Sequence, residues 1–542
     1  MVSSPIRHIR TPRPSDTAMT DTQNTSRQVY LETFGCQMNV LDSQLVKSQL
    51  TGLGYQFTDN WKKADVILYN TCSVREHAEQ KVYSRIGIVS KYKKEQQNRN
   101  IILGVIGCMA EREGTDMAIR HQDIDLLCGP GELDKVPMLI DNAIKTHPDF
   151  RGGKANVRAA LQGNTHRRSS TFAAAEDELE MLDLARSFSP DEHAGSAYVR
   201  ITRGCNKFCT YCVVPNTRGA EVHRPPQHII DECKKLVDSG VIEITLLGQT
   251  VNHYHYDNAA AVMSEHGHAQ PQIGSVITVN GSRRGSDDVT TFANLLHRIH
   301  EEVSGLKRLR FVTSFPRDFG DDILQVIRDS PRICQYLHLP VQSGSDRVLK
   351  LMNRDYTVSM FQDLLGRVRH YLPDCQIASD LICGFPTETE EDHQMTAKLL
   401  EESRFKNCFI FKYSPRPGTA AIERFEDDVD EATKKRRNNE LLAIQNKVST
   451  EIHQSMIGKT VRVFVESLSK QSQKESVSAA DPSITLGWEK PRSTTQLCGR
   501  TDGDLIVMLD GDTSMIGSIV EAQIESAMPL TLFGKCVGEP VG

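Results

Sequence analysis

Three cysteines stand at CxxxCxxC spacing in the stretch RGCNKFCTYC, which covers residues 203–212. In one tight loop, the thiolates of Cys205, Cys209 and Cys212 can converge on three irons of a cubane [4Fe–4S] cluster. The fourth iron would then be open, and an open iron can chelate the amino and carboxylate groups of S-adenosylmethionine (SAM). A structural zinc knuckle is the other interpretation, but such sites use four ligands in paired CxxC units, and no partner pair lies nearby. The spacing therefore favours the cluster.

Outward from this loop, the sequence alternates short apolar runs with helical stretches. Six of the runs are predicted as strands, at residues 197–202, 242–247, 308–313, 335–339, 376–382 and 407–413. Six βα units are too few for a closed eightfold barrel, so an α/β region with a partial (βα)6 barrel is predicted. The cysteine loop follows the first strand, at the rim where α/β enzymes hold their sites.

A second set of cysteines, Cys36, Cys72 and Cys108, lies in the first part of the chain. Each follows a predicted strand of a parallel α/β sheet, at residues 29–35, 65–70 and 101–107, and a weaker strand is predicted at 124–127. The carboxyl ends of parallel strands lie side by side along one edge, so the three thiols are expected to meet and to hold a second cluster. Without the first triplet, buried structural cysteines would be the commoner explanation.

These residues and their surroundings resemble the methylthiotransferase family of radical SAM enzymes, from about residue 30 to the C-terminus, apart from a linker and two insertions. The matching stretches are TFGCQMN (33–39), NTCSVR (70–75), GCMA (107–110), CVVP (212–215), TRG (217–219), LGQ (247–249), LHLPVQSGS (337–345) and DLICGFP (380–386). The residues after Cys36 and around Cys212 are most similar to the branch that acts on N6-isopentenyladenosine next to the anticodon of tRNA.

The resemblance implies two [4Fe–4S] clusters, and SAM as both radical source and methyl donor. It implies that the Cys36/Cys72/Cys108 cluster delivers sulfur to C2 of the adenine. The protein would then position and shield these groups. Polar residues in the cysteine loop or after strand ends are candidates for binding SAM: Tyr211, Gln249, Asn252, Gln342, Ser343 and Asp380. The alternative for each is packing, a helix cap or a turn.

Four positions depart from the family pattern. Asn216 stands where tyrosine is usual, Thr250 where asparagine is usual, Phe315 where histidine is common, and His223 where serine is usual. These changes leave the six cysteines intact but affect positions close to the expected SAM and substrate contacts.

The 542 residues predict several domains, and the net charge of -6 argues against bulk electrostatic coating of nucleic acid. The predicted order is a disordered extension (1–27), the N-terminal methylthiotransferase domain (28–147), a linker (148–190), the radical SAM core (191–430), a connecting helix (431–457) and a small β-barrel (458–537). This last domain resembles a TRAM module through LCGRT at 497–501, which implies RNA binding. Polar insertions at 253–288 and 468–495 are predicted as surface loops.

The partners are inferred from the same features. We expect tRNA as substrate, a flavodoxin- or ferredoxin-like electron donor, and iron–sulfur assembly and sulfur-supply proteins. No apolar run is long enough for a membrane span, and the 14 cysteines suit metal ligation in a reducing cytoplasm. A monomer is expected. The alternatives are a sister enzyme acting on threonylcarbamoyl-adenosine or a ribosomal-protein aspartate, and a non-catalytic iron–sulfur RNA-binding protein.

Overall fold

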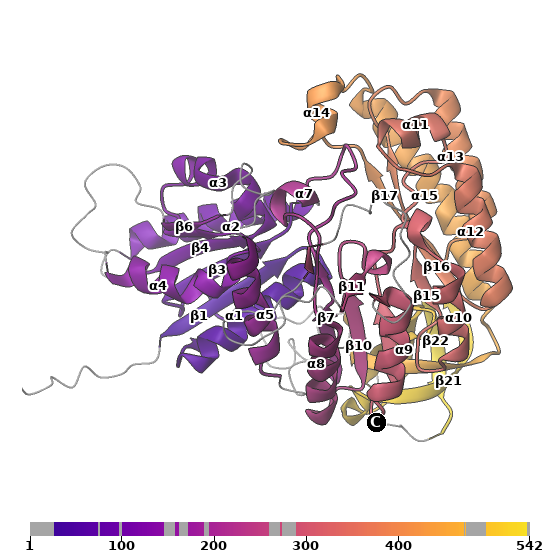
Figure 1. Ribbon diagram of the computed structural model, residues 1–542, viewed down its shortest axis with the longest axis horizontal. Helices are drawn as coiled ribbons and strands as arrows, with labels where there is room; N and C mark the ends of the chain where they lie inside the picture. The colour runs from indigo at the N-terminus through magenta and orange to yellow at the C-terminus, as the bar shows by residue number, and fades with distance from the viewer. Residues whose placement is uncertain are drawn as a thin grey trace, which may run out of the picture.

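The computed structural model describes residues 27–73, 76–96, 100–145, 158–161, 172–188, 194–258, 272–273, 289–470, 472 and 495–538. Figure 1 shows an N-terminal domain beside a larger barrel-like region, with the last strands packed against the end of that region. The predicted α/β class with a small C-terminal barrel is confirmed. The expected disorder of residues 1–27 falls almost entirely outside the described residues.

The N-terminal domain is a parallel six-stranded sheet in the order β2-β1-β3-β4-β5-β6. Its strands are β1 (Gln28–Phe34), β2 (Gln56–Phe57), β3 (Val66–Thr71), β4 (Ile102–Gly107), β5 (Leu126–Cys128) and β6 (Arg158–Ala160). Every residue of the central strands β3 and β4 is buried, as expected when helices cover both faces of a parallel sheet. The predicted strands are therefore confirmed, and β6 lies within the segment predicted as a linker.

Helices on the two faces of this sheet form two separate apolar cores. The helices are α1 (Gln37–Gly52), α2 (Glu76–Glu95), α3 (Cys108–Arg120), α4 (Val136–Lys145) and α5 (Phe172–Ala185). Apolar side chains of α1, α4 and α5 share one core, and those of α2 and α3 share the other. α5 also belongs to the predicted linker segment, so this part of the chain helps to cover the sheet.

The central region contains two parallel three-stranded sheets, β14-β10-β7 and β15-β16-β17. Their strands are β7 (Ser196–Arg200), β10 (Glu243–Leu247), β14 (Arg308–Phe311), β15 (Tyr336–His338), β16 (Gln376–Cys383) and β17 (Asn407–Lys412). A parallel bridge between Leu309 and Ile333 joins the two sheets at β14, and one apolar core runs through both. The predicted partial barrel of six strands is thus present.

Helices cover the outside of this partial barrel (Figure 1). They are α8 (Pro226–Asp238), α9 (Phe292–Glu302), α10 (Asp321–Asp329), α12 (Val358–Tyr371), α13 (Glu390–Ser403) and α15 (Glu431–Gln454). α15 is the predicted connecting helix. It packs against α13 and β17 and so belongs to the barrel's covering layer.

The insertion predicted as a surface loop at 253–288 is partly built into the core, which corrects that prediction. The 3₁₀ turn η2 (Val251–His253) leads into β11 (His255–Asp257), which pairs with β13 (Val289–Thr291). Tyr254 and Tyr256 are only 1% and 2% exposed. Alternate aromatic residues turn one face of this segment inward, which the polar composition of the whole insertion concealed. Residues 259–271 and 274–288 lie outside the described part.

The C-terminal strands close into a five-stranded barrel in the order β18-β19-β20-β22-β21. These strands are β18 (Thr460–Leu468), β19 (Gln496–Thr501), β20 (Ile506–Asp510), β21 (Ile519–Met528) and β22 (Thr531–Cys536). Arg308 of β14 donates to the carbonyl oxygens of Arg500 and Thr501, each at 3.0 Å, which fixes this barrel to the central region. Most of the second predicted insertion, 471 and 473–494, is not described.

Candidate functional site

The structure brings Cys36, Cys72 and Cys108 to one edge of the N-terminal sheet. They follow the carboxyl ends of β1, β3 and β4, which are adjacent strands. Cys36 is the N-cap residue of α1 and Cys108 is the first residue of α3, where the helix dipole favours a negatively charged ligand. The three thiols are therefore placed and polarised for binding iron.

The protein electrostatics at this edge support thiolate ligands. A hydrogen bond with the Cys72 thiol, aided by the Arg218 guanidinium, lowers the pKa of Cys36 to about 6 although burial opposes the change. Burial raises the pKa of Cys108, and Arg218 acts against that rise. Cys36 is thus ionised near neutral pH, as a metal ligand needs to be.

Close backbone approach is what lets these strand ends meet. Gly35 has φ = +140°, and a Cβ at this position would lie 2.5 Å from the Cβ of Cys72. Any larger residue would push Cys36 and Cys72 apart.

Two buried asparagine side chains join the helix after β1 to the end of β3 by hydrogen bonds at the same sheet edge. Asn39 donates to Oδ1 of Asn70 at 3.0 Å, and Asn70 donates to the carbonyl oxygen of Asn39 at 2.8 Å. Both are fully buried, and Oδ1 of Asn39 lies 3.3 Å from the Sγ of Cys36. By contrast the thiol of Cys128, at the end of β5, donates to the carbonyl of Glu132 at 3.1 Å, as a structural cysteine does.

The second triplet lies in the loop after β8 (Thr202–Arg203). Burial raises the pKa of Cys205, and the charges of Cys212 and Cys209 add to the rise. Burial likewise raises the pKa of Cys212 to about 12, with Cys209 as the next cause. Three thiols that repel one another's negative charge in a buried loop are suited to sharing a cationic group, so both sets fit a cluster held by three thiolates.

Gly204 makes this loop possible. Its φ is +65°, and a Cβ would lie 1.9 Å from the carbonyl oxygen of Ala220. No L side chain fits there, so the glycine before Cys205 is a geometric requirement of the loop.

Arg354, which the sequence reasoning missed, lies against the second triplet. It is 9% exposed, and its Nη1 donates to the Sγ of Cys209 at 3.4 Å. Its other donors reach the carbonyl oxygen of Pro340 at 2.8 Å and the hydroxyl of Tyr356 at 2.9 Å. Nothing in the local sequence marks this arginine, because its partners lie up to 145 positions away.

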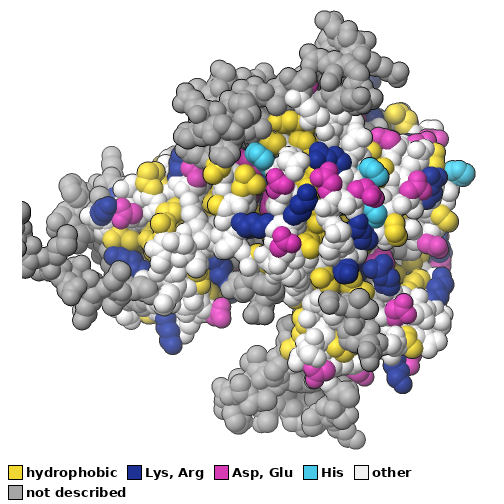
Figure 2. Space-filling model, turned by 60° about the horizontal axis from the view of Figure 1, so that its bottom comes forward, with side chains coloured by type: hydrophobic (Ala, Val, Ile, Leu, Met, Phe, Trp, Pro, Cys, Tyr) yellow, Lys and Arg dark blue, Asp and Glu magenta, His cyan; other side chains and the backbone are white. Residues whose placement is uncertain are grey.

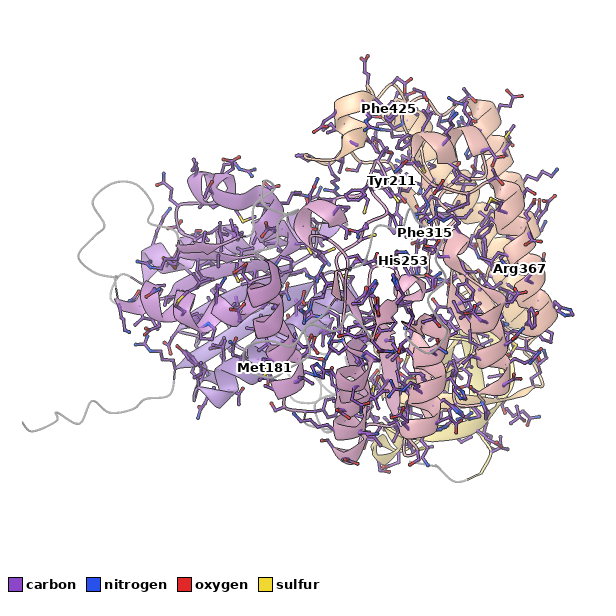
Figure 3. All side chains as sticks on the ribbon, in the orientation of Figure 1. Met181, Tyr211, His253, Phe315, Arg367 and Phe425 are labelled. Carbon is purple, nitrogen blue, oxygen red and sulfur yellow. The ribbon has the colours of Figure 1, made fainter. Side chains whose placement is uncertain are left out.

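Phe315, one of the departures from the family pattern, packs against three cations, of which Arg317 is the most distant at 5.7 Å from the ring centroid. The guanidinium of Arg354 lies 4.5 Å and the ammonium of Lys207 lies 4.8 Å from its ring centroid. Figure 3 shows Tyr211, Phe315 and His253 on the side of the central region that faces the N-terminal domain, whereas Arg367 lies on the outer helices. A phenyl ring there stabilises these cations, which an additional imidazolium would repel.

The residues expected to bind SAM are placed as follows. Tyr211 is inside the cysteine loop, and burial raises its pKa well above the usual value. Gln342 has φ = +75° and its backbone forms a bridge to Leu381 of β16. Oδ1 of Asp380 lies 3.1 Å from Nε2 of His338, which is the last residue of β15. The carboxylate of Asp380 therefore lies at the rim of the barrel.

Two other expected SAM contacts are engaged with the protein itself. Asn252 donates to the carbonyl oxygen of Phe315 at 2.8 Å and accepts from the backbone N–H of Phe315 at 2.7 Å. Its amide therefore fixes the loop that carries Phe315. Ser343 lies 3.4 Å from the hydroxyl of Thr396, while Gln249 follows β10 at the rim in a half-buried position.

Arg218 links the two triplets. It follows Cys212 in the same segment, yet its charge acts on Cys36 and Cys108 of the other domain. Its Nη2 donates to Asp42 of α1 at 2.7 Å, and Asp42 also pairs with Arg200 of β7 at 3.3 Å. The sequence singled out Arg218 only as part of the TRG motif at 217–219, and the fold was needed to show that it links the two triplets.

Comparisons with known proteins are consistent with this geometry. Residues 28–129 match the model described as uncharacterized protein family UPF0004, and residues 199–400 match the radical SAM superfamily. Among curated relatives, the tRNA-2-methylthio-N(6)-dimethylallyladenosine synthase of Rhodopirellula baltica is 39% identical, over 94% of this chain and 95% of the relative. Relatives with the same name from Bacteroides thetaiotaomicron (37% identical; 95% of this chain, 97% of the relative) and Parabacteroides distasonis (38%; 96% and 97%) are also similar.

Proposed function

Because this chain belongs to the family of tRNA-2-methylthio-N6-dimethylallyladenosine synthases, we propose that it methylthiolates C2 of N6-isopentenyladenosine next to the anticodon of tRNA. It is a radical SAM methylthiotransferase that uses SAM and [4Fe–4S] chemistry. In the finer proposal there are two clusters, one on Cys205, Cys209 and Cys212 and the other on Cys36, Cys72 and Cys108. When bound, these groups and SAM supply the radical, the sulfur and the methyl group.

One observation carries this proposal: both cysteine triplets are fixed to the same buried ion pair. Arg218 pairs with Asp42 at 2.7 Å, and its side chain is 6% exposed while that of Asp42 is fully buried. The N-terminal sheet edge and the barrel loop are therefore held facing each other. A reaction that opens a carbon–hydrogen bond at one site and delivers sulfur from the other requires this fixed separation.

The protein's own residues would then act by positioning. Arg354 and Lys207 hold the Cys205–Cys212 loop against Phe315, and Asn252 holds Phe315 in place. Tyr211, Gln249, Gln342, Ser343 and Asp380 remain proposed SAM contacts at the barrel rim. The adenosine must leave its stack to reach both sites, so a loop substrate or a flipped base is expected.

Recognition of tRNA by charge needs a local surface. On the face shown in Figure 2, basic and acidic side chains are interspersed. The basic run at 434–437 is largely engaged within the protein, since Lys434 pairs with Asp427 at 2.6 Å and Arg437 pairs with Glu388 at 2.9 Å. The C-terminal β-barrel stays a proposed tRNA contact through its resemblance to a TRAM module and not through charge, since residues 458–537 hold 8 Lys and Arg against 10 Asp and Glu.

We also propose a flavodoxin- or ferredoxin-like electron donor, together with iron–sulfur assembly and sulfur-supply proteins. None of the 14 cysteines, all of which lie in the described part of the chain, forms a disulfide, which suits a reducing compartment such as the cytoplasm. Among the described residues, no helix is long and apolar enough to cross a membrane.

The test is mass spectrometry of nucleosides from tRNA of cells lacking the gene, with and without its restoration. Loss of 2-methylthio-N6-isopentenyladenosine, and its return with the wild type but not with Cys36→Ala or Cys209→Ala, supports the proposal. Loss of the threonylcarbamoyl methylthio product instead would change the substrate assignment. If no methylthio nucleoside changes, the proposal is wrong.

A further inference from the structure

A cluster of three histidines and one glutamate lies behind the Cys205 loop and plays no part in the proposed reaction. It is built from two short segments, Glu221-Val222-His223 and His253-Tyr254-His255. Glu221 and His223 stand two apart where the extended strand β9 (Val222–His223) begins, whereas His253 ends the 3₁₀ turn η2 and His255 begins β11. The residues between them, Val222 and Tyr254, are 5% and 1% exposed, and Tyr254 belongs to the apolar core of the central region.

The polar atoms of this cluster lie at metal-binding separations. Ligand atoms of Glu221, His223 and His253 are all within 4.8 Å of one another. Nδ1 of His253 is 2.6 Å from Oε2 of Glu221. The ring of His255 lies 5.6 Å from that of His223, centroid to centroid, and 6.4 Å from that of His253. Two imidazoles and a carboxylate are thus gathered around one point, and a third imidazole, that of His255, lies next to them.

The environment of His223 is the observation that points to a bound ion. It is 0% exposed, and among the described residues neither of its ring nitrogens has a hydrogen-bond partner. A buried polar group without a partner costs stability, so a buried imidazole with two idle nitrogens needs an explanation. A cation bound to one of these nitrogens would provide it.

Glu221 is oriented as metal-ligating carboxylates are. Its Oε1 accepts a hydrogen bond from the hydroxyl of Thr250 at 2.7 Å, which leaves Oε2 directed at His253. Its backbone N–H donates to Oδ1 of Asn206, the neighbour of Cys205, at 3.0 Å. Both His223 and Thr250 are positions at which this chain departs from the family pattern described above.

We propose that Glu221, His223 and His253 bind one divalent transition-metal ion, Zn²⁺ by the chemistry of the ligand set, and that the neighbouring His255 turns toward the bound ion as a fourth ligand. Imidazole nitrogen and carboxylate oxygen are zinc ligands, and four protein ligands make a closed, structural site. The ion would join β9 (Val222–His223), η2 and β11 and brace the Cys205 loop through Asn206.

A second grouping of similar residues does not carry the same inference. Ligand atoms of Glu390, His393 and Glu440 also lie within 4.8 Å of one another. However, Glu390 is exposed and pairs with Arg436 at 2.6 Å and Arg437 at 3.2 Å, and Glu440 pairs with Arg436 at 2.9 Å. Arginines already neutralise these carboxylates, so this grouping serves as a matched control.

The experiment measures zinc in the full-length protein after anaerobic reconstitution with iron and sulfide, addition of Zn²⁺ alone, and dialysis against a mild chelator. The wild type is expected to retain one zinc ion per chain. His223→Ser, which restores the residue usual in the family, and His253→Gln are expected to lose most of it, with iron content unchanged. Glu440→Gln is expected to retain zinc as the wild type does.

X-ray absorption at the zinc edge of the wild type tests the ligands without relying on any variant. Nitrogen and oxygen at about 2.0–2.1 Å with imidazole scattering is the expected result, whereas sulfur at about 2.3 Å would mean that zinc occupies cysteine sites. Wild-type protein without zinc, equal zinc in His223→Ser and His253→Gln, or a zinc–sulfur shell would each overturn the proposal. These results do not depend on methylthiotransferase activity.

Discussion

Replacing Asp183 with asparagine should strongly destabilise the protein, because Asp183 anchors a buried network of charges between α5 and the barrel. Its carboxylate accepts from Arg200 at 2.8 Å and from Arg203 at 2.8 Å, and Arg224 lies 3.7 Å away. The side chains of Asp183 and Arg200 are each 1% exposed. Asparagine keeps the shape of the side chain but leaves these arginine charges undercompensated in a dry environment.

The expected magnitude follows from this burial. Removing one partner of a buried ion pair costs about 3–5 kcal/mol, and here one carboxylate serves several arginines. The matched control is Asp363→Asn, which breaks the pair with Arg367 at 3.1 Å on the outer face of α12. Asp363 is 71% exposed, and an exposed pair of this kind contributes only about 0.3–0.5 kcal/mol.

The assay is urea-induced unfolding at pH 7, followed by circular dichroism for the wild type and both variants. Asp183→Asn should lower the free energy of unfolding several times more than Asp363→Asn does. A loss of less than about 1 kcal/mol for Asp183→Asn would refute the reasoning, because it would mean that water or rearrangement compensates the arginines.

The difference in unfolding free energy between the wild type and Asp183→Asn should also depend on pH. Burial alone would raise the pKa of Asp183, but Arg200, Arg224 and Arg203 outweigh it and hold that pKa well below its usual range. A depressed pKa stabilises the folded state above the unfolded value of about 3.9, and this contribution is lost as pH falls toward the folded value. The difference between the wild type and Asp183→Asn should therefore stay constant between about pH 5 and 7 and shrink below about pH 4. A constant difference down to pH 2 would contradict the assignment of the effect to charge.

Three further predictions concern the buried lysine at the C-terminal barrel and the two cysteine sites. Burial lowers the pKa of Lys406 to about 8, so the folded state releases this proton at a lower pH than the unfolded state does. The wild type should therefore gain stability relative to Lys406→Met as pH rises from about 8 to 10. Urea unfolding of both proteins across that range measures this gain. Arg354→Lys keeps the charge but loses the planar fork that reaches the sulfur of Cys209, so less iron should survive a chelator challenge than in the wild type; equal retention would show that the fork is dispensable. Cys36→Ala should lower the iron content of reconstituted protein by about half, whereas Cys128→Ala, whose thiol bonds a backbone carbonyl, should leave it unchanged.

The sequence was sufficient for the elements whose local pattern is strong. Continuous apolar runs predicted β3 and β4, and the small β-rich end of the chain predicted a barrel. The start of α1 at Gln37 has no such local signal, because Cys36 is the N-cap residue and forms no side-chain cap hydrogen bond. α5 was overlooked because the small and acidic residues of its segment resemble a linker, and their function, to pair with arginines of the barrel, is a tertiary one.

The candidate site divides in the same way. The six cysteines were predicted as ligands from their spacing and from their positions after strands, because ligands in one loop or at one sheet edge follow a local sequence pattern. The same pattern predicted Asn252 as a SAM contact, yet both polar atoms of its amide form hydrogen bonds with the backbone of Phe315. Arg354 could not be predicted from a local pattern, since Cys209 and Phe315, the contacts that place it at the site, are distant in sequence. Residues that orient ligands are found only once the fold shows which side chains are buried beside them.

The Asp42 pair constrains how the substrate enters. Asp42 is fully buried and binds Arg200 of β7 and Arg218 of the barrel loop, while Asp42 itself belongs to α1 of the N-terminal domain. Moving the two domains apart would separate Asp42 from both arginines and leave Arg218 without its carboxylate, so two buried ion pairs would be lost before any apolar contact is. A tRNA loop would have to supply the lost energy and would gain nothing at the reacting carbon from it. We therefore expect the adenosine to enter between domains that stay together, so a disulfide or crosslink that joins α1 to the barrel away from the site should leave methylthiolation intact, and its loss would show that the domains must separate.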